Sequence, residues 1–179
     1  MTLNFSTLKT NLYNWAVENI PVGMPVIYYF ANSPRPEIDY LSLYLASFVQ
    51  IDWDYTQQPT DDTGISQMVG DREFTLQCQA YGTNSMQVLE NLRTSLQKQT
   101  VLDTLRVNGI VFVNWFPIND TTQLLNSRFE IRAQMDILFR IAQQYSDNLG
   151  VINTVVANET ILNVDGSTVI TQMINIPPI

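Results

Sequence analysis

Histidine is absent from this 179-residue chain, and cysteine occurs once, at Cys78. The absence of histidine removes the side chain best suited to proton transfer near neutral pH, which is also the commonest metal ligand. A single cysteine excludes an intrachain disulfide framework and any metal site built from several thiolates. Cys78 shares its strand parity with Leu76 and Ala80 and has no histidine to activate it, so we interpret it as an inert core thiol.

Basic residues are scarce as well: nine Lys and Arg stand against seventeen Asp and Glu, which gives a net charge of -8. This balance provides no large basic surface for binding nucleic acid through counterion release. The sequence has no apolar run of about 18 residues, and it begins without the basic and apolar segments of a signal peptide. We therefore expect a soluble, unprocessed protein with no membrane partner.

The chain is rich in apolar residues, which make up 45% of it against 15% charged residues, enough to fill a core. Helical spacing predicts a helix over about residues 7–19, capped by Ser6, and another from about 86 to 99. Alternating or continuous apolar runs predict five strands, and the polar stretch 54–66 reads as an exposed loop. The strands are expected at residues 24–31, 40–53, 72–81, 110–113 and 129–141.

These elements predict an α+β fold with a mainly antiparallel sheet of about four to five strands and two main helices packed on it. After about residue 146 the composition shifts to Asn, Thr, Val and Ile with almost no charge. Asp165 and Gly166 form a short turn signal between two β-rich runs. We therefore expect a main domain over residues 1–146 and a C-terminal β-hairpin arm over 147–179.

Two groups of residues are candidates for contacts between copies. Charges of alternating sign follow one face of the 129–141 strand, which suits either a register-setting contact or an ordinary solvated sheet face. An isolated hairpin is marginal in water, so the arm must pack on its own body or on a neighbour's sheet. The candidate interface residues are Glu130, Arg132, Asp136 and Arg140 in the strand, and Val164, Val169 and Ile170 in the arm.

The densest acidic cluster consists of Asp52, Asp54, Asp61 and Asp62. It has too few ligands at regular spacing for a calcium site, so we interpret it as an exposed acidic loop. We expect no metal, no cofactor and no catalytic residue. The alternative of another class is a small-molecule binding module or hydrolase that uses the acidic 52–62 region.

Three segments carry a resemblance to a known family: the Pro-rich turn 34–40, the segment 79–82 that leads into the helix at 86–96, and the aromatic-Glu-x-Arg strand at 129–139. Over roughly residues 5–145 the chain resembles the bacteriophage neck or tail terminator family. The resemblance implies a non-enzymatic virion protein of the tail or neck, assembled in the host cytoplasm. It also leaves open a tail-completion or baseplate component of similar fold.

In such a role the chain would form a homo-oligomeric ring, expected to be a hexamer, that caps the tail tube and joins it to the head connector. The implied partners are the tail tube protein, the tail sheath where the tail has one, and head connector or adaptor proteins. In a ring we expect the arm to join a neighbour's sheet. DNA would only pass through the lumen, and six copies would carry 6 × -8 = -48 charges that repel its phosphates.

Overall fold

The computed structural model describes residues 3–29, 34–58, 60–61, 63–125, 127–150 and 155–176; from residue 155 on it describes side chains only at 160 and 162–168. The chain divides into two compact units. The first consists of Met1–Tyr55 and Val69–Tyr145, and the second of Thr56–Met68 and Ser146–Ile179.

The main sheet has seven strands, with β1, β2, β4, β9 and β5 in order, while β3 pairs with β4 and β6 with β9. β1 runs parallel to β2, whereas the pairs β2–β4, β5–β9 and β6–β9 are antiparallel. The α+β class with a mainly antiparallel sheet is therefore confirmed, with more strands than the four to five expected. The elements are α1 (Phe5–Glu18), β1 (Val26–Tyr28), β2 (Tyr40–Gln50), β3 (Tyr55–Gln58), β4 (Ile65–Tyr81), α2 (Ser85–Ser95), α3 (Gln99–Val107), β5 (Ile110–Trp115), β6 (Asn119–Asp120), β7 (Gln123–Leu125), β8 (Arg128–Glu130), β9 (Arg132–Asn148), β10 (Val155–Leu162) and β11 (Thr168–Ile176).

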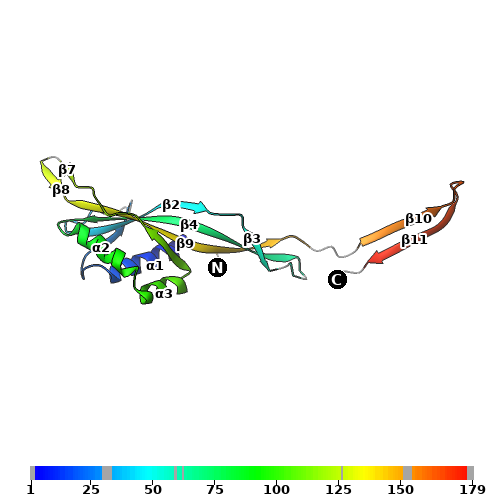
Figure 1. Ribbon diagram of the computed structural model, residues 1–179, viewed down its shortest axis with the longest axis horizontal. Helices are drawn as coiled ribbons and strands as arrows, with labels where there is room; N and C mark the ends of the chain where they lie inside the picture. The colour runs from blue at the N-terminus through cyan, green and yellow to red at the C-terminus, as the bar shows by residue number, and fades with distance from the viewer. Residues whose placement is uncertain are drawn as a thin grey trace. The chain divides into compact units, whose positions relative to one another are not determined.

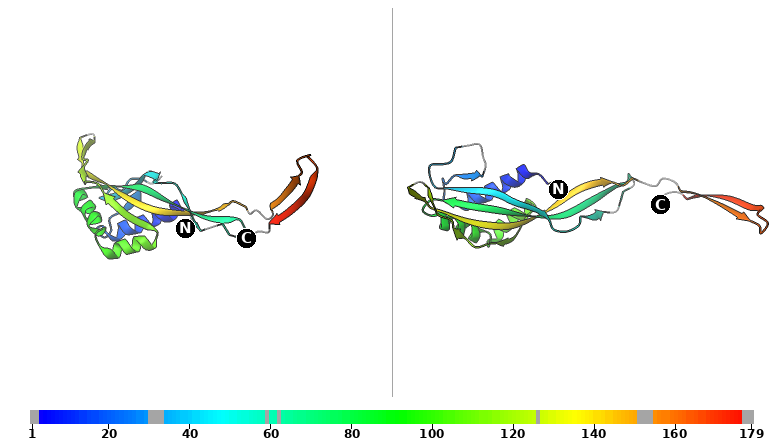
Figure 2. Two further views of the ribbon diagram at one scale, coloured as in Figure 1. Left: turned by 45° about the vertical axis from the view of Figure 1, so that its right-hand side comes forward. Right: turned by 90° about the horizontal axis from the view of Figure 1, so that it is seen from above.

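Helices α1, α2 and α3 cover one face of the main sheet in the first unit (Figure 1; Figure 2). Beneath them, a row of aromatic rings crosses the sheet from β2 to β5. The Phe48 and Phe74 rings stack at 5.9 Å between centroids, and Phe74 stacks on Phe139 at 5.5 Å. Trp15 of α1 meets Phe139 edge-on at 6.0 Å, and its indole N–H donates to the hydroxyl of Ser95 at 3.1 Å. The core is thus both close-packed and hydrogen-bonded where polar groups are buried.

The helix ends differ from the sequence expectation. Ser6 does not cap the first helix, because the side chain of Asn4 accepts hydrogen bonds from the backbone N–H groups of Ser6 and Thr7 at 2.9 and 3.2 Å. Asn and Ser are about equally good caps, so composition alone could not choose between two neighbouring candidates. The second helix, α2, ends at Ser95 and does not reach Gln99. A separate helix, α3, begins at Gln99.

The apolar residues at odd positions from Leu41 to Trp53 predict that the odd-numbered side chains of β2 face the core, which is wrong beyond Leu45. A bulge between Leu45 and Ser47 inserts one residue opposite β4, so the parity of the strand reverses. Phe48 packs under the helices, while Val49 is 57% exposed. The odd-numbered apolar residues after the bulge therefore leave the core instead of filling it.

The polar stretch 54–66, which was predicted to be an exposed loop, contains β-structure. It contains β3 and the beginning of β4, which pair with each other. In the second unit the backbone N–H of Leu149 donates to the Gly64 carbonyl at 2.9 Å. A Cβ at Gly64 would lie 2.6 Å from the Cα of Gly150, and its φ is +83°, so this position requires glycine.

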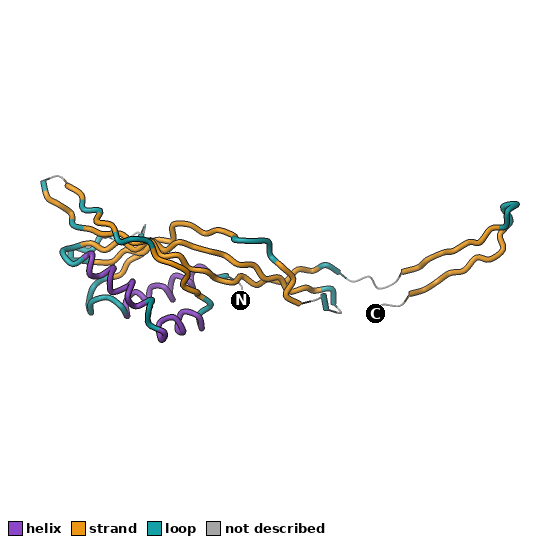
Figure 3. The backbone as a smooth tube through the Cα atoms, in the orientation of Figure 1, coloured by secondary structure: helices purple, strands orange, loops and turns teal. Residues whose placement is uncertain are grey.

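The C-terminal hairpin is confirmed. β10 and β11 form an antiparallel two-stranded sheet of their own, paired from Val155 opposite Ile176 to Leu162 opposite Thr168 with a register shift between Ile161 and Leu162 (Figure 3). Their turn is closed by Asp165, which accepts hydrogen bonds from the backbone N–H and the hydroxyl of Ser167 at 2.9 and 2.7 Å. The Asp-Gly signal correctly located this turn.

Candidate assembly surfaces

The charged residues of β9 lie on the sheet face opposite the helices, and the structure gives several of them partners within the chain. Arg140 donates to Glu73 of β4, with Nη2 and Oε1 2.5 Å apart. The Nε–H of Arg132 donates to the Thr121 carbonyl at 2.6 Å. Asp136 accepts a long bond of 3.4 Å from Gln134. These charged side chains therefore bind partners within their own chain, as they do on an ordinary solvated sheet face.

Glu130 lies outside β9, at the end of β8, and forms an ion pair with Arg35. The guanidinium of Arg35 also lies over two stacked rings, with its Cζ 5.5 Å from the Tyr40 centroid and 5.0 Å from that of Tyr81. The two rings are 4.4 Å apart and nearly parallel. Burial and the neighbouring Tyr81 raise the pKa of Tyr40 to about 12, so the Tyr40 hydroxyl stays neutral at physiological pH.

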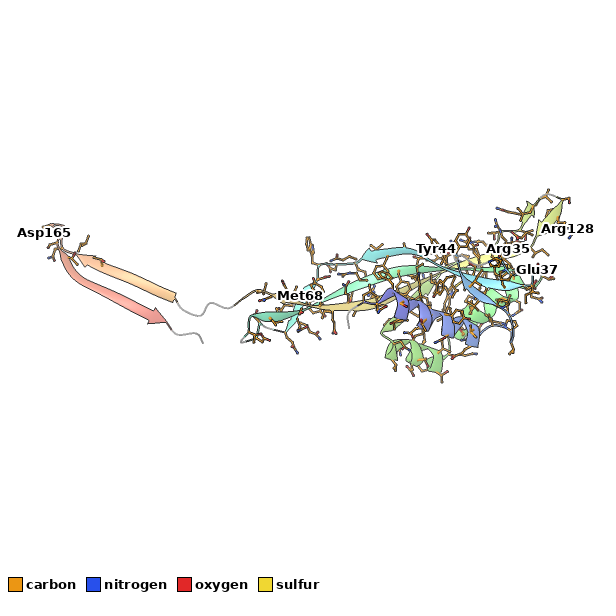
Figure 4. All side chains as sticks on the ribbon, turned by 180° about the vertical axis from the view of Figure 1, so that it is seen from behind. Arg35, Glu37, Tyr44, Met68, Arg128 and Asp165 are labelled. Carbon is orange, nitrogen blue, oxygen red and sulfur yellow. The ribbon has the colours of Figure 1, made fainter. Side chains whose placement is uncertain are left out.

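The three segments that carry the family resemblance meet at this ion pair. Arg35 and Tyr40 belong to the Pro-rich turn, Tyr81 to the segment before α2, and Glu130 to the aromatic-Glu-x-Arg strand. They surround an open groove of about 270 Å³. Figure 4 shows Arg35 and Glu37 at the end of the first unit from which β8 projects with Arg128. The groove is lined by Arg35, Pro36, Glu37, Ile38, Asp39, Tyr40, Tyr81, Gly82, Thr83, Phe129, Glu130 and Ile131.

The hairpin of β7 and β8, next to this groove, carries large apolar side chains in solvent. Leu124 and Phe129 are paired across the hairpin and are 60% and 74% exposed. Leu125 and Ile131 are 47% and 43% exposed. Contiguous exposed apolar side chains of this size are typical of protein contact surfaces. We call this group of four residues the β7–β8 tip.

A second exposed apolar group follows β2 after its bulge. Val49, Ile51, Trp53 and Tyr55 alternate along the chain and are 57%, 44%, 90% and 59% exposed. We call these four residues the β2 stripe. Trp53 is the most exposed of the four. The stripe lies beside a hollow of about 330 Å³ bounded by residues 50–53.

The acidic residues of the 52–62 region that the structure describes do not converge on one site. The side chain of Asp54 is only 11% exposed and forms a bidentate ion pair with Arg72, with both N–O distances at 2.7 Å. The Tyr145 hydroxyl donates to the same carboxylate at 2.9 Å. The hydrogen bond from Arg72, followed by that from Tyr145, lowers the pKa of Asp54 against the opposing effect of desolvation. Asp54 thus has a structural role, and it is not part of a solvated acidic rim.

Two further acids of the cluster, Asp52 and Asp61, accept local hydrogen bonds. The Thr63 hydroxyl donates to Asp61 at 2.7 Å and lowers its pKa, together with the backbone N–H groups of Ile65 and Thr63, both at 2.9 Å. Asp52 accepts from the backbone N–H of Trp53 at 2.8 Å and is exposed. Asp62 lies outside the described residues.

The described part of the chain contains no group of three or more His, Cys, Asp or Glu side chains placed to hold a metal ion. None of its helices is both long and apolar enough to cross a lipid bilayer. Burial, with a smaller contribution from Asp136, raises the pKa of the Cys78 thiol far above its ordinary value. Cys78 is completely buried in the core, as its strand parity predicted.

Comparison with known proteins identifies the family. A family model described as phage neck terminator protein matches residues 6–172. The chain belongs to the phage neck terminator family. No curated protein matches it in sequence. A solved structure that is similar to this terminator is the sheath/tube terminator, in its extended state, of the extracellular contractile injection system PVC.

That structure has 9% sequence identity with this chain and a TM-score of 0.45, and the match covers 92% of this chain and 65% of the other. The terminator described here thus spans less than two thirds of that protein's length. Membership of the family agrees with the resemblance carried by the three sequence segments.

Sequence reasoning missed the β7–β8 tip of the terminator. Leu124 and Leu125 form a short apolar pair directly before Asn126 and Ser127, which is the signal of a small hairpin turn. The signal is short, and strands of three residues fall below the length at which alternation is informative. In the arm, Val164 is fully exposed at the turn, whereas the side chains of Val169 and Ile170 lie outside the described part.

Proposed function

We propose that this terminator ends tail growth as a ring of identical copies that caps the tail tube and presents its other side to the head connector. The observation that carries the proposal is the match of residues 6–172 to the neck terminator family. In this role the chain acts by surface complementarity, with no bond made or broken. It works in the tail or neck of the virion and assembles in the host cytoplasm.

The surfaces of the chain support this role. The β7–β8 tip and the β2 stripe expose apolar side chains that a persistent monomer would leave in water, at about 25 cal/mol per Å² of apolar area. A subunit with distinct contact surfaces can form a closed ring through head-to-tail contacts and still have a face free for other proteins. The partners of that ring are the tail tube protein, the sheath in a contractile tail, and the connector proteins.

For contacts between subunits, we favour the apolar surfaces and the arm with Val164 over the charged β9 face. Arg132 and Arg140 already have acceptors within the chain, so using them at an interface would require those bonds to be exchanged. The net charge of -8 per copy also opposes close approach of like charges, while it keeps passing DNA from binding to the ring wall.

The first experiment measures the mass of the purified chain, alone and after mixing with tail tubes. We expect rings that bind to tube ends, seen as a discrete high-mass species and as caps in electron micrographs. A monomer that persists at high concentration and ignores the tubes would contradict the proposal.

The second experiment tests the function itself, by polymerising tail tube protein in the presence of small amounts of the terminator. Tubes should become shorter and stop growing as their ends are capped. The double variant Leu124→Asp and Phe129→Asp places charge on the β7–β8 tip and should lose this effect while remaining folded. Val107→Asp is the matched control, because Val107 is 87% exposed at the end of α3.

A further inference from the structure

The turn that follows β2 presents the most exposed tryptophan of the chain. Trp53 is 90% exposed, whereas Trp15 is 4% exposed and Trp115 is half-buried. An aromatic side chain covers roughly 150–250 Å² when it is buried, and tryptophan is enriched among the residues that carry most of the binding energy of protein interfaces. Trp53 therefore has the chemistry of an interface anchor, and within its own chain it remains in water.

Hydrogen bonds fix the turn that carries this anchor. The side-chain amide of Gln50 donates to the Asp52 carbonyl at 2.9 Å and to Oδ1 of Asp54 at 3.1 Å. Oδ1 of Asp52 accepts from the backbone N–H of Trp53 at 2.8 Å. Asp54 is itself held by its ion pair with Arg72. A side chain on such a preorganised turn loses less conformational freedom on binding, which favours affinity.

A groove between α1 and α3 has the right size for such a side chain. Its volume is about 300 Å³, at the lower end of the range of small-molecule sites, which is about 300–1,000 Å³. It therefore suits one fused ring system better than a helix or a strand. Trp15, Val101 and Leu105 provide the apolar part of its lining. The groove and the turn both belong to the first unit, and they share no residue.

The polar part of the groove also suits an indole ring. Four asparagines supply amide oxygens, which are acceptors of the kind that a buried indole N–H needs. Two of them are oriented, because their side-chain N–H groups donate to the Trp15 and Thr104 carbonyls at 2.7 and 2.9 Å. The four are Asn11, Asn14, Asn19 and Asn108, and the last two make these bonds.

Charge favours the helices as the receiving surface. In α1, α2 and α3, together with the residue that directly precedes α3, four basic residues stand against three acidic ones, while the rest of the chain has five basic and fourteen acidic residues. A neighbour that approaches with an acidic segment such as the turn at Asp52 therefore meets less repulsion at the helices than elsewhere. The basic residues are Lys9, Arg93, Lys98 and Arg106, and the acidic ones are Glu90, Asp103 and Glu18, which lines the groove.

We propose that Trp53 of one copy inserts into the α1–α3 groove of the next copy and anchors the contact between neighbouring subunits. The donor and the receiver are different surfaces, so the contact is head-to-tail, which is the type that can close into a ring of identical subunits. The proposal rests on the proposed ring, for which it names the residue that each subunit inserts and the groove that receives it.

Photo-cross-linking tests this contact directly. The photoreactive amino acid p-benzoylphenylalanine replaces Trp53, so an aromatic anchor is retained, and the protein is irradiated alone and with tail tubes. We expect a product of twice the chain mass in which position 53 is joined to peptides of α1 or α3, identified by mass spectrometry. The same amino acid at Met86, which is 47% exposed on α2 and does not line the groove, should give at least about tenfold less of this product.

Two results of this experiment would overturn the inference. Equal yields at positions 53 and 86 would show that the groove has no preference for the Trp53 turn. Cross-links from position 53 to tail tube protein alone would assign the anchor to a different partner.

A pair of complementary variants provides a second readout. Trp53→Ala removes the anchor and leaves the groove intact, whereas Asn14→Trp fills the groove from an exposed position and leaves Trp53 intact. Each variant alone should be monomeric. Mixed in equal amounts, they should form a dimer that grows no further, because each pair has one intact anchor and one intact groove. Formation of that dimer would also show that both variants are folded.

Met86→Trp is the matched control for the added tryptophan, and it should assemble as the wild-type protein does. Rings formed by either complementary variant alone, or a mixture that stays monomeric, would refute the Trp53 contact. If such rings still cap tubes, the terminator role stands without it. A wild-type chain that neither forms rings nor caps tubes would instead refute the proposed function, and this inference with it.

Discussion

At the scale of single residues, Gly70 makes the Asp54–Arg72 ion pair possible. A Cβ at Gly70 would lie 1.8 Å from Oδ1 of Asp54 and 2.5 Å from Nη1 of Arg72. We predict that Gly70→Ala lowers the free energy of unfolding by about 1–3 kcal/mol, as overpacking typically does. Urea denaturation followed by circular dichroism measures this loss.

The control for this substitution is a double-mutant cycle. Asp54→Ala removes the group that the new methyl would strike, so Gly70→Ala should cost less in that background than in the wild-type protein. Equal costs in both backgrounds would show that the close approach of Gly70 and Asp54 is not what requires glycine.

Asp54 also predicts a dependence of stability on pH. Its pKa is lowered in the folded state, first by the hydrogen bond from Arg72, so its contribution is complete above the ordinary aspartate pKa of about 3.9. The contribution is lost as the pH falls through the folded pKa. We expect the stability difference between the wild-type protein and Asp54→Asn to be constant from about pH 6 to 8 and to shrink below about pH 4.

Denaturant titrations of both proteins across this pH range test the prediction. Other acids with lowered pKa values, such as Asp61 and Asp120, occur in both proteins and cancel in the difference. A difference that grows on acidification would contradict the sign argued here.

Cys78 should be chemically silent in the native protein. It is completely buried, and burial raises its pKa, so almost no thiolate is present at pH 8 and reagents cannot reach it. A colorimetric thiol assay should detect less than about a tenth of one thiol per chain in the folded state and one thiol in denaturant. Rapid reaction without denaturant would indicate that the core opens locally.

At the scale of elements, the bulge in β2 makes two adjacent residues differ sharply. Phe48 contacts Phe5 and Phe74 with ring centroids 5.2 and 5.9 Å apart, whereas Val49 is mostly exposed. We predict that Phe48→Ala costs about 2–4 kcal/mol of stability and Val49→Ala less than about 0.5 kcal/mol. Thermal unfolding of the two variants compares them directly, and comparable losses would place both side chains in the core.

The same pair of residues shows how far the sequence determines the elements. The faces of residues 72–81 in β4 and 132–141 in β9 were predictable because their apolar residues alternate, as at Phe74, Leu76 and Cys78, with Leu138 as the one exception. The face of β2 after residue 45 was not predictable. One inserted residue moves every later side chain to the opposite face of the strand and leaves apolar residues on both faces. The hairpin turn at Asp165 and Gly166 was predictable because the φ of Gly166 is +81°, a conformation that favours glycine.

The candidate surfaces were less predictable than the elements. Arg35, Tyr81 and Glu130 form one cluster, but they are far apart in the chain and no local period links them. The family resemblance selected the right segments without showing that they meet. The neutralisation of Asp54 by Arg72 was invisible for the same reason, because the partners belong to two different segments.

At the scale of the whole molecule, net charge distinguishes two kinds of subunit contact. Each copy carries -8, so copies in a ring repel one another, and salt weakens this repulsion as the screening length falls from about 30 Å at 0.01 M to about 3 Å at 1 M. Apolar contacts and backbone strand pairing are not weakened by such screening, whereas exposed ion pairs are.

We therefore predict that the fraction of chain in rings rises with sodium chloride concentration, by about twofold or more at a protein concentration where half is assembled at low salt. Sedimentation velocity across a salt series measures this fraction. Rings that dissociate as salt is added would instead indicate contacts through charged side chains such as Glu130, Arg132, Asp136 and Arg140. Because the two interfaces respond to salt with opposite sign, one titration of the wild-type protein decides between them.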